Sequence, residues 1–166
     1  MSKAVMLSIR PKWCDKICGG EKTIEVRKTR PKLETPFRCY IYCTQSGVAL
    51  GAWRKHGMVI GEFTCDRIFP INVFDNGSIQ NWFFEHMERS CLTYEELADY
   101  IGNDRTGYGW HISDLRIYDA PRELSEFERP YECNECDAKW ATECNACHEE
   151  GKIKHPPQSW CYVEEG

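Results

Sequence analysis

A strand, a helix and a second strand are predicted in succession within the first 28 residues, and this succession constrains the fold more than any other feature. Residues 4–9, AVMLSI, are a short apolar run typical of a buried strand. Residues 11–18 begin with a proline and are followed by two glycines, which are start and stop signals of a helix. In residues 22–28, KTIEVRK, apolar and polar residues alternate, as in a strand with one buried face.

The rest of the chain predicts a small mixed α+β domain built on a curled sheet or a barrel. Helices are expected over residues 79–89 and 93–102, and in the second Thr93 and Glu96 form a capping box. Further strands are expected over residues 39–44, 58–68 and 107–119, and SWCYV near the C-terminus has the composition of an edge strand.

Length and composition indicate one globular domain with a small appendage. The chain has 166 residues, and 42% of them are apolar, which is enough for a packed core. No apolar run approaches the ~20 residues that cross a bilayer, and the N-terminus has no signal-peptide cleavage pattern. We therefore expect a cytoplasmic protein with no membrane partner. Most of its eleven cysteines are expected to be reduced thiols.

Charge is distributed unevenly along an acidic chain of net charge −5. Residues 1–38 hold ten Lys or Arg against four Asp or Glu, a net of +6, and the remainder holds eleven against twenty-two, a net of −11. This asymmetry favours a polyanionic or phosphate-bearing partner on one face. The alternative is that the charges only keep the surface soluble.

The strand predicted over residues 22–28 carries side chains that could perform chemistry. If Ile24 and Val26 are buried, Thr23, Glu25 and Arg27 line the opposite face, and Lys22 lies where the glycine turn meets the strand. A lysine amine can act as a base or nucleophile when its surroundings favour the neutral form, and an adjacent carboxylate can shuttle the proton. The alternative is a solvent-facing strand with ordinary surface charges.

The stretch GEKTIEVRK, preceded by the helix PKWCDKICGG, resembles the opening of the ASCH domain, a relative of the PUA RNA-binding fold. The resemblance continues through RCYIYCT, MVIGEFTCDRI and GYGWHISDLRIYD, so it covers residues 3 to about 127. It implies a small PUA-like β-barrel flanked by helices, with a cleft near Lys22 and Arg27.

The resemblance implies several functions for this cleft. Members of the family are inferred RNA binders, amidohydrolases that deacylate N4-acetylcytidine, or ribonucleases. The catalytic lysine of the amidohydrolases matches Lys22 here, but the threonine that they carry two residues after the signature threonine is replaced by Glu25. Their glutamate before the helix start is replaced by Ser90, and the nearest acid is Glu88. Glu25 could supply the missing carboxylate.

Binding of RNA or a nucleoside-like small molecule requires cations for phosphate and aromatic faces for bases. Arg27 and Lys28 would hold phosphate or a carbonyl oxygen, while Glu25 would accept a hydrogen bond or shuttle a proton. The remaining candidate ligand-binding residues are Arg10, Lys12, Trp13, Tyr108, Trp110 and His111. For the aromatic residues the alternative is a place in the core, and for His111 it is a structural role.

Two CxxC pairs near the C-terminus predict a metal site. Cys133, Cys136, Cys144 and Cys147 provide four thiolates for a tetrahedral zinc, which favours a structural rather than a catalytic ion. The spare ligands are His148, His155 and Cys161. Two redox pairs, or no metal at all, are the alternatives.

We expect residues 1–127 to form the ASCH (PUA-like) domain. Residues 128–166 are expected to form a Cys-rich zinc-binding extension that returns to the barrel and could also contact a protein partner.

Overall fold

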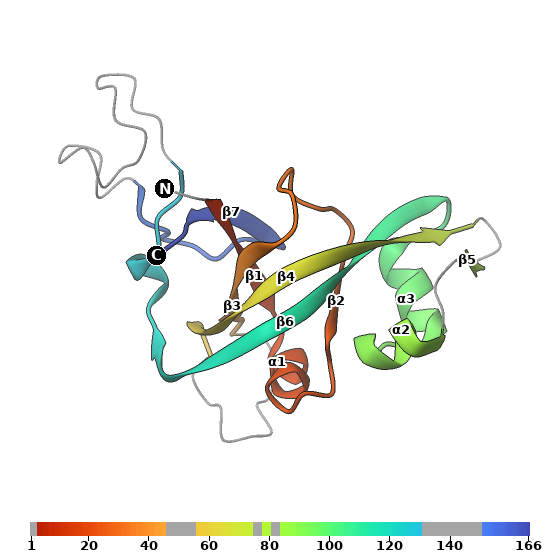
Figure 1. Ribbon diagram of the computed structural model, residues 1–166, viewed down its shortest axis with the longest axis horizontal. Helices are drawn as coiled ribbons and strands as arrows, with labels where there is room; N and C mark the ends of the chain where they lie inside the picture. The colour runs from red at the N-terminus through yellow and green to blue at the C-terminus, as the bar shows by residue number, and fades with distance from the viewer. Residues whose placement is uncertain (1–2, 46–55, 75–77, 81–83, 131–150) are drawn as a thin grey trace.

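The computed structural model describes residues 3–45, 56–74, 78–80, 84–130 and 151–166. Within these ranges the chain folds into one mixed sheet with three short α-helices and one 3-10 helix (Figure 1). The strands are β1 (Lys3–Ile9), β2 (Ile24–Arg27), β3 (Phe37–Cys43), β4 (Met58–Val73), β5 (Ile79–Gln80), β6 (Arg105–Arg122) and β7 (Trp160–Glu164). The α-helices are α1 (Pro11–Cys18), α2 (Phe84–Ser90) and α3 (Tyr94–Ile101), and the 3-10 helix spans Leu124–Glu126.

The sheet has the strand order β2-β6-β4-β3-β1-β7, with β5 added beside the end of β4. The β1–β3 pair is parallel and the other pairs are antiparallel. The two long strands β4 and β6 form a twisted ribbon with three shifts of register, which bend it. At one of them Gly61 is required, because a Cβ there would lie 2.5 Å from the carbonyl oxygen of Arg116. The edge position predicted for SWCYV is confirmed, since β1 is the one described strand with which β7 pairs.

The expectation of a closed barrel is wrong. Strands β2 and β7 lie at opposite ends of the strand order, and among the described residues no backbone ladder joins them. Side-chain contacts bridge the gap instead, because Arg27 of β2 reaches Ser159, the residue before β7. The domain is therefore α+β with an open, curled sheet.

Both faces of the sheet are covered, which explains why β1 is apolar at almost every position. On one face Leu7, Ile41, Phe63 and Trp110 pack against α1 in the central core. On the other face Met6 and Tyr40 pack against Phe127, Ile153 and Val163. A third cluster joins Ile24 and Val26 of β2 to Leu97 and Ile101 of α3.

The local predictions differ in their outcome. The limits expected for α1 and the capping box of α3 are confirmed, with the Thr93 side chain accepting from the Glu96 backbone. The helix expected over residues 79–89 begins later, since Ile79 and Gln80 pair with β4 and α2 begins at Phe84. Tertiary pairing with β4 overrides the helical pattern there.

The C-terminal residues that the structure describes are part of the same sheet as residues 3–45. Glu128 forms an isolated bridge with Lys152, and β7 pairs with β1 along its length. The division of the chain at residue 127 stays a prediction. No helix in the described ranges is long and apolar enough to cross a membrane.

Candidate functional site

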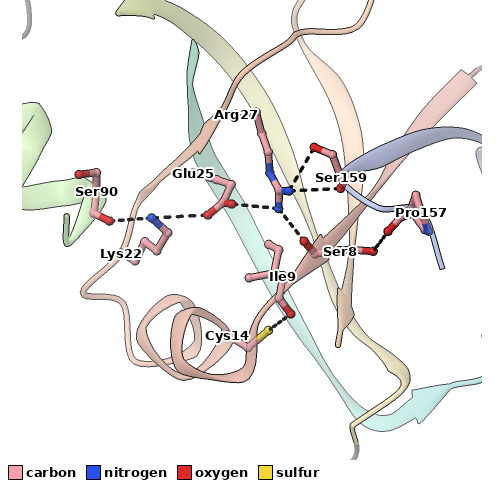
Figure 2. A network of polar contacts seen from close by, with 9 residues as sticks. All are labelled: Ser8, Ile9, Cys14, Lys22, Glu25, Arg27, Ser90, Pro157 and Ser159. Atoms are coloured by element: carbon pink, nitrogen blue, oxygen red, sulfur yellow. Dashed lines mark hydrogen bonds and ion pairs between the residues drawn. The ribbon is translucent and has the colours of Figure 1, made fainter. Parts of the chain in front are cut away.

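Three charged side chains lie in a row inside the protein. Lys22, Glu25 and Arg27 are 2%, 6% and 6% exposed. The Lys22 Nζ atom lies 3.5 Å from Glu25 Oε2, and Arg27 Nη2 lies 3.0 Å from Glu25 Oε1 (Figure 2). Each carboxylate oxygen of Glu25 therefore faces one cation, and the carboxylate connects the two.

The alternation of β2 produces this row. Ile24 and Val26 pack into the cluster under α3, so Glu25 and Arg27 point to the other side of the strand. The predicted alternation is therefore present, but the polar side is buried as well. The structure does not have the solvent-facing strand that was the alternative interpretation.

The ammonium of Lys22 is held by the C-terminal end of α2. Its Nζ atom donates to the backbone oxygen of Ser90 at 2.6 Å, and it lies 5.1 Å from the centre of the Trp13 ring. Ser90 is fully buried and its hydroxyl donates to the Met87 carbonyl. Ser90 thus contributes a carbonyl oxygen to the site.

The guanidinium of Arg27 joins β2 to two other segments. Its Nη2 donates to the carbonyl oxygen of Ser8 at 2.8 Å, and its Nη1 lies 3.3 Å from both the carbonyl and the hydroxyl oxygen of Ser159. The Ser8 hydroxyl donates in turn to the Pro157 carbonyl at 2.6 Å (Figure 2). Residues from both ends of the chain therefore form one wall.

The charged row faces a cavity of about 610 Å³. Its walls come from the end of β1, from α1, β2 and α3, and from the segment before β7. The lining residues are Ser8, Ile9, Arg10, Trp13, Lys22, Glu25, Val26, Arg27, Thr44, Leu92, Tyr100, Pro156, Pro157, Gln158 and Ser159. The cavity has the size of small-molecule sites in proteins, which are about 300–1,000 Å³.

Comparison with solved structures identifies the architecture around this cavity. The crystal structure of ASCH from Zymomonas mobilis is 20% identical, with a TM-score of 0.63, over 98% of this chain and 88% of that one. A crystallised single-residue variant of the same protein gives 19% identity and a TM-score of 0.64 over 99% and 92% of the two chains. This chain has the ASCH fold. No family model matches it, and no curated protein matches it in sequence.

The ASCH fold places some of the predicted ligand-binding residues at the cavity and others next to it. Arg10, Trp13 and Arg27 line it. Lys12 is outside the lining, with its Nζ 4.5 Å from the centre of the Trp13 ring. Lys28 is likewise outside, with its Nζ 5.2 Å from the centre of the Tyr100 ring. Both lysines are exposed, and they add positive charge beside the opening.

The remaining predicted residues lie away from the cavity lining. Trp110 is fully buried in the central core, against Phe37 and Trp160. Tyr108 packs against the same core. His111 Nδ1 is hydrogen-bonded at 2.6 Å to Asp66. Burial alone would raise the pKa of Asp66, but the bond to His111 and its charge lower it below the ordinary value.

Thr23 is also outside the cavity lining. Its backbone N–H donates to the Arg89 carbonyl, its own carbonyl accepts from Ile112, and these bonds hold the start of β2 between α2 and β6. The Thr23 hydroxyl is buried with no hydrogen-bond partner in the described part of the chain. Lys22, Thr23 and Glu25 are the candidate catalytic residues of this stretch, and the structure brings two of them together, Lys22 and Glu25.

Sequence reasoning missed Tyr100 and Ser8, whereas the C-terminal segment that it expected to return to the domain does line the cavity with residues 156–159. Tyr100 had a usable signal, because it lies three residues after Leu97 on an amphipathic helix whose buried face meets β2. Burial raises the pKa of its hydroxyl, so the group stays a neutral hydrogen-bond donor and acceptor near neutral pH. Ser8 had no signal of its own in the sequence.

Two cysteines of α1 near the site are poor nucleophiles. A hydrogen bond with Cys43, together with burial, raises the pKa of Cys14, and burial raises the pKa of Cys18 to about 11. Both side chains are therefore thiols rather than thiolates near neutral pH. The same hydrogen bond lowers the pKa of Cys43 in β3, but Cys43 lies outside the cavity lining, where Lys22 and Glu25 are the groups with suitable chemistry.

The four cysteines of the predicted zinc site lie outside the described residues. Of the spare ligands, His155 is exposed and Cys161 lies in β7, where it packs beside the Met6 face of the sheet. Among the described residues no group of three or more His, Cys, Asp or Glu side chains is arranged to hold a metal.

We predict that Arg27→Met will lower the free energy of unfolding by about 3 kcal/mol, because it leaves one oxygen of the buried Glu25 carboxylate without its cation and removes the hydrogen bonds to Ser8 and Ser159. Urea titration followed by tryptophan fluorescence measures this. Arg30→Met removes an exposed arginine three residues away and should change stability by less than about 0.5 kcal/mol. Equal losses for the two variants would show that the contacts of Arg27 do not hold this wall together.

Proposed function

We propose that this protein binds RNA or a modified nucleoside in the cavity lined by Lys22, Glu25 and Arg27. The observation that carries the proposal is the buried row of two cations and one carboxylate at the wall of a cavity of about 610 Å³. Such a row offers fixed donors and an acceptor to the edge of a base. The ASCH fold of the chain supports the proposal as an analogy.

The aromatic residues of the cavity provide the second requirement. Trp13 and Tyr100 lie on α1 and α3, and each presents a partly exposed ring to the cavity. Unpaired bases are commonly recognised by stacking on such rings combined with hydrogen bonds to their edges. Arg10 at the lining, with Lys12 and Lys28 beside it, would then contact the RNA backbone.

We predict that Tyr100→Ala will weaken ligand binding about tenfold through loss of stacking. The measurement is fluorescence polarisation with a short single-stranded RNA and calorimetry with N4-acetylcytidine. Tyr94→Ala is the matched control, since Tyr94 lies on the same helix, is 37% exposed against 38% for Tyr100, and is outside the cavity lining. Equal effects of the two substitutions would count against binding in this cavity.

A second candidate function is hydrolysis of the acetyl amide of N4-acetylcytidine. The contact of 3.5 Å between Lys22 Nζ and Glu25 Oε2 favours it, because a buried lysine and carboxylate side by side suit proton transfer. Water would add to the acetyl carbonyl with Glu25 taking its proton, and Lys22 would stabilise the oxyanion. Glu25 would return this proton to N4 as the bond between N4 and the acetyl carbon breaks, so that cytidine and acetic acid leave, and the acid would ionise to acetate.

If this second function holds, wild-type protein will release cytidine from N4-acetylcytidine, and Lys22→Met and Glu25→Gln will each lower the rate by at least about a hundredfold. Chromatography of the products measures the rate. Lys32→Met, which removes an exposed lysine outside the cavity lining, should keep it. The same preparations incubated with RNA test for cleavage, and a binding protein without turnover would yield neither cytidine nor RNA fragments.

We also propose that Cys133, Cys136, Cys144 and Cys147 hold a structural zinc ion. The spacing of the two CxxC pairs supports this, as does the free state of all seven described cysteines, which fits a reducing compartment such as the cytoplasm. The same extension, residues 128–166, also contains the cavity wall from Pro156 to Ser159. If the extension instead contacts a protein partner, binding of that partner should not depend on residues 1–127.

We predict about one zinc ion per chain in purified protein, and loss of it in the double variant Cys133→Ser with Cys136→Ser. Elemental analysis of protein purified without chelators measures the metal content. Cys18→Ser is the control and should keep the zinc, because Cys18 is a half-buried cysteine outside the two CxxC pairs. Cys39 and Cys65 are less suitable for this purpose because both are fully buried. Zinc-free wild-type protein would contradict the prediction.

A further inference from the structure

We propose that the ligand of this cavity carries an anionic phosphate ester that lies beside Lys22 and Arg27, so that the protein prefers a nucleotide to the corresponding nucleoside. This inference rests on the proposed function, because it specifies which ligand the same cavity takes. It depends on the balance of charge inside the cavity and on where the hydrogen-bond donors of the two buried cations point.

The cavity lining has an excess of positive charge. It contains three cations, Arg10, Lys22 and Arg27, and one carboxylate, Glu25. Three of these four residues are buried, and Arg10 is exposed at the rim. The formal charges of the buried row sum to +1, and those of the whole lining sum to +2.

The single carboxylate has no capacity left for this excess. Glu25 Oε1 faces Arg27 and Glu25 Oε2 faces Lys22. The other acceptors are uncharged oxygens of Ser90, Ser8 and Ser159. Carbonyl dipoles satisfy hydrogen bonds but do not cancel a charge, and an uncompensated buried charge is costly. A ligand that brings a negative charge would therefore gain more here than a neutral one.

Donors are available for that charge. An ammonium has three N–H groups, and the described residues place two oxygens within 3.5 Å of Lys22 Nζ, so one N–H has no oxygen partner. The Nε–H of Arg27 also has no partner among the described residues, but this nitrogen is buried, so the donor that the row offers to the cavity is the ammonium of Lys22. Arg10 adds an exposed guanidinium at the opening, and guanidinium groups match the geometry of phosphate oxygens.

The rest of the cavity indicates what the anion is attached to. Trp13, Leu92 and Tyr100 give it an apolar and aromatic side that suits a base. A phosphate ester is the anionic group that accompanies a base in nucleotides and in RNA. The same chemistry can come from a free mononucleotide or from one residue of an RNA chain, and the experiment separates these two sources.

The test is isothermal titration calorimetry at fixed ionic strength with four probes: cytidine, cytidine 5′-monophosphate, inorganic phosphate and a short single-stranded cytidine-containing RNA. We expect the monophosphate to bind at least tenfold more tightly than cytidine. RNA that binds while the monophosphate does not would place the recognised phosphate in a chain, and the reverse would identify a free nucleotide.

Two substitutions, one that removes a positive charge and one that removes a negative charge, make the test specific. Lys22→Met should reduce the preference for the monophosphate to less than about threefold, whereas Glu25→Gln should increase it, because it removes the carboxylate while keeping its shape. Arg116→Met is the matched control, since it also removes one positive charge but lies on β6 outside this cavity. If Lys22→Met does not fold, Arg10→Gln at the exposed rim provides the same comparison.

The outcomes separate this inference from the proposed function. Equal affinity for cytidine and its monophosphate overturns the inference and leaves the proposed function intact. Binding of inorganic phosphate that depends on Lys22, without binding of any base-containing probe, supports an anion site and overturns the proposed function. If none of the four probes binds, the inference and the proposed function are both overturned. Both are also overturned if the protein prefers the monophosphate but Lys22→Met and Arg10→Gln leave that preference unchanged, because the ligand then binds outside this cavity.

Discussion

The contacts of one guanidinium hold the site together. Arg27 bonds at once to the carboxylate of Glu25, the backbone of Ser8 and the backbone and hydroxyl of Ser159, and these groups belong to three separate segments of the chain. Because β2 and β7 share no backbone ladder, this side chain does the work that strand pairing would do in a closed barrel. A planar group with several donors in fixed directions suits this role, and lysine could not replace it.

Burial of three charged groups beside a cavity is costly for folding, and it is a common feature of binding and catalytic sites. In this protein the cost is limited because every oxygen of Glu25 is paired and the cations also bond to carbonyl groups. The site is therefore preorganised in the absence of ligand. A preorganised site loses little entropy when it binds, and its donors need no rearrangement to meet a charge on the ligand.

Local signals in the sequence predicted the local structure well. The helix α1 and the capping box of α3 depend on residues a few positions apart, so propensity and spacing were enough. The alternation of β2 likewise placed Glu25 and Arg27 on one side of the strand. The error at Ile79 arose because pairing with β4, which is distant in sequence, decided the conformation of residues that also fit a helix.

The site itself was only partly predictable for the same reason. Lys22 and Glu25 lie within one turn and one strand, so their proximity follows from short-range geometry. Ser8 and Ser159 lie about 150 positions apart in the sequence, and the pairing of β7 with β1 brings them together. No local spacing in the sequence predicts that contact. Trp110 and His111 were predicted to bind ligand but lie outside the cavity lining. A tryptophan suits a core as well as a binding site, and a histidine suits a structural hydrogen bond, here to Asp66.

The pairing of β7 with β1 also determines whether the cavity can exist. One wall is formed by residues 156–159, and the strand β7 that follows them is fixed to β1 by backbone pairing. Ser159 lies 132 positions after Arg27 in the sequence, so Lys22, Glu25 and Arg27 can be in place on β2 before this wall is. Enclosure of the charged row is therefore coupled to the docking of a single edge strand, and a chain in which β7 is detached from β1 would keep these groups but lose the wall that completes the cavity.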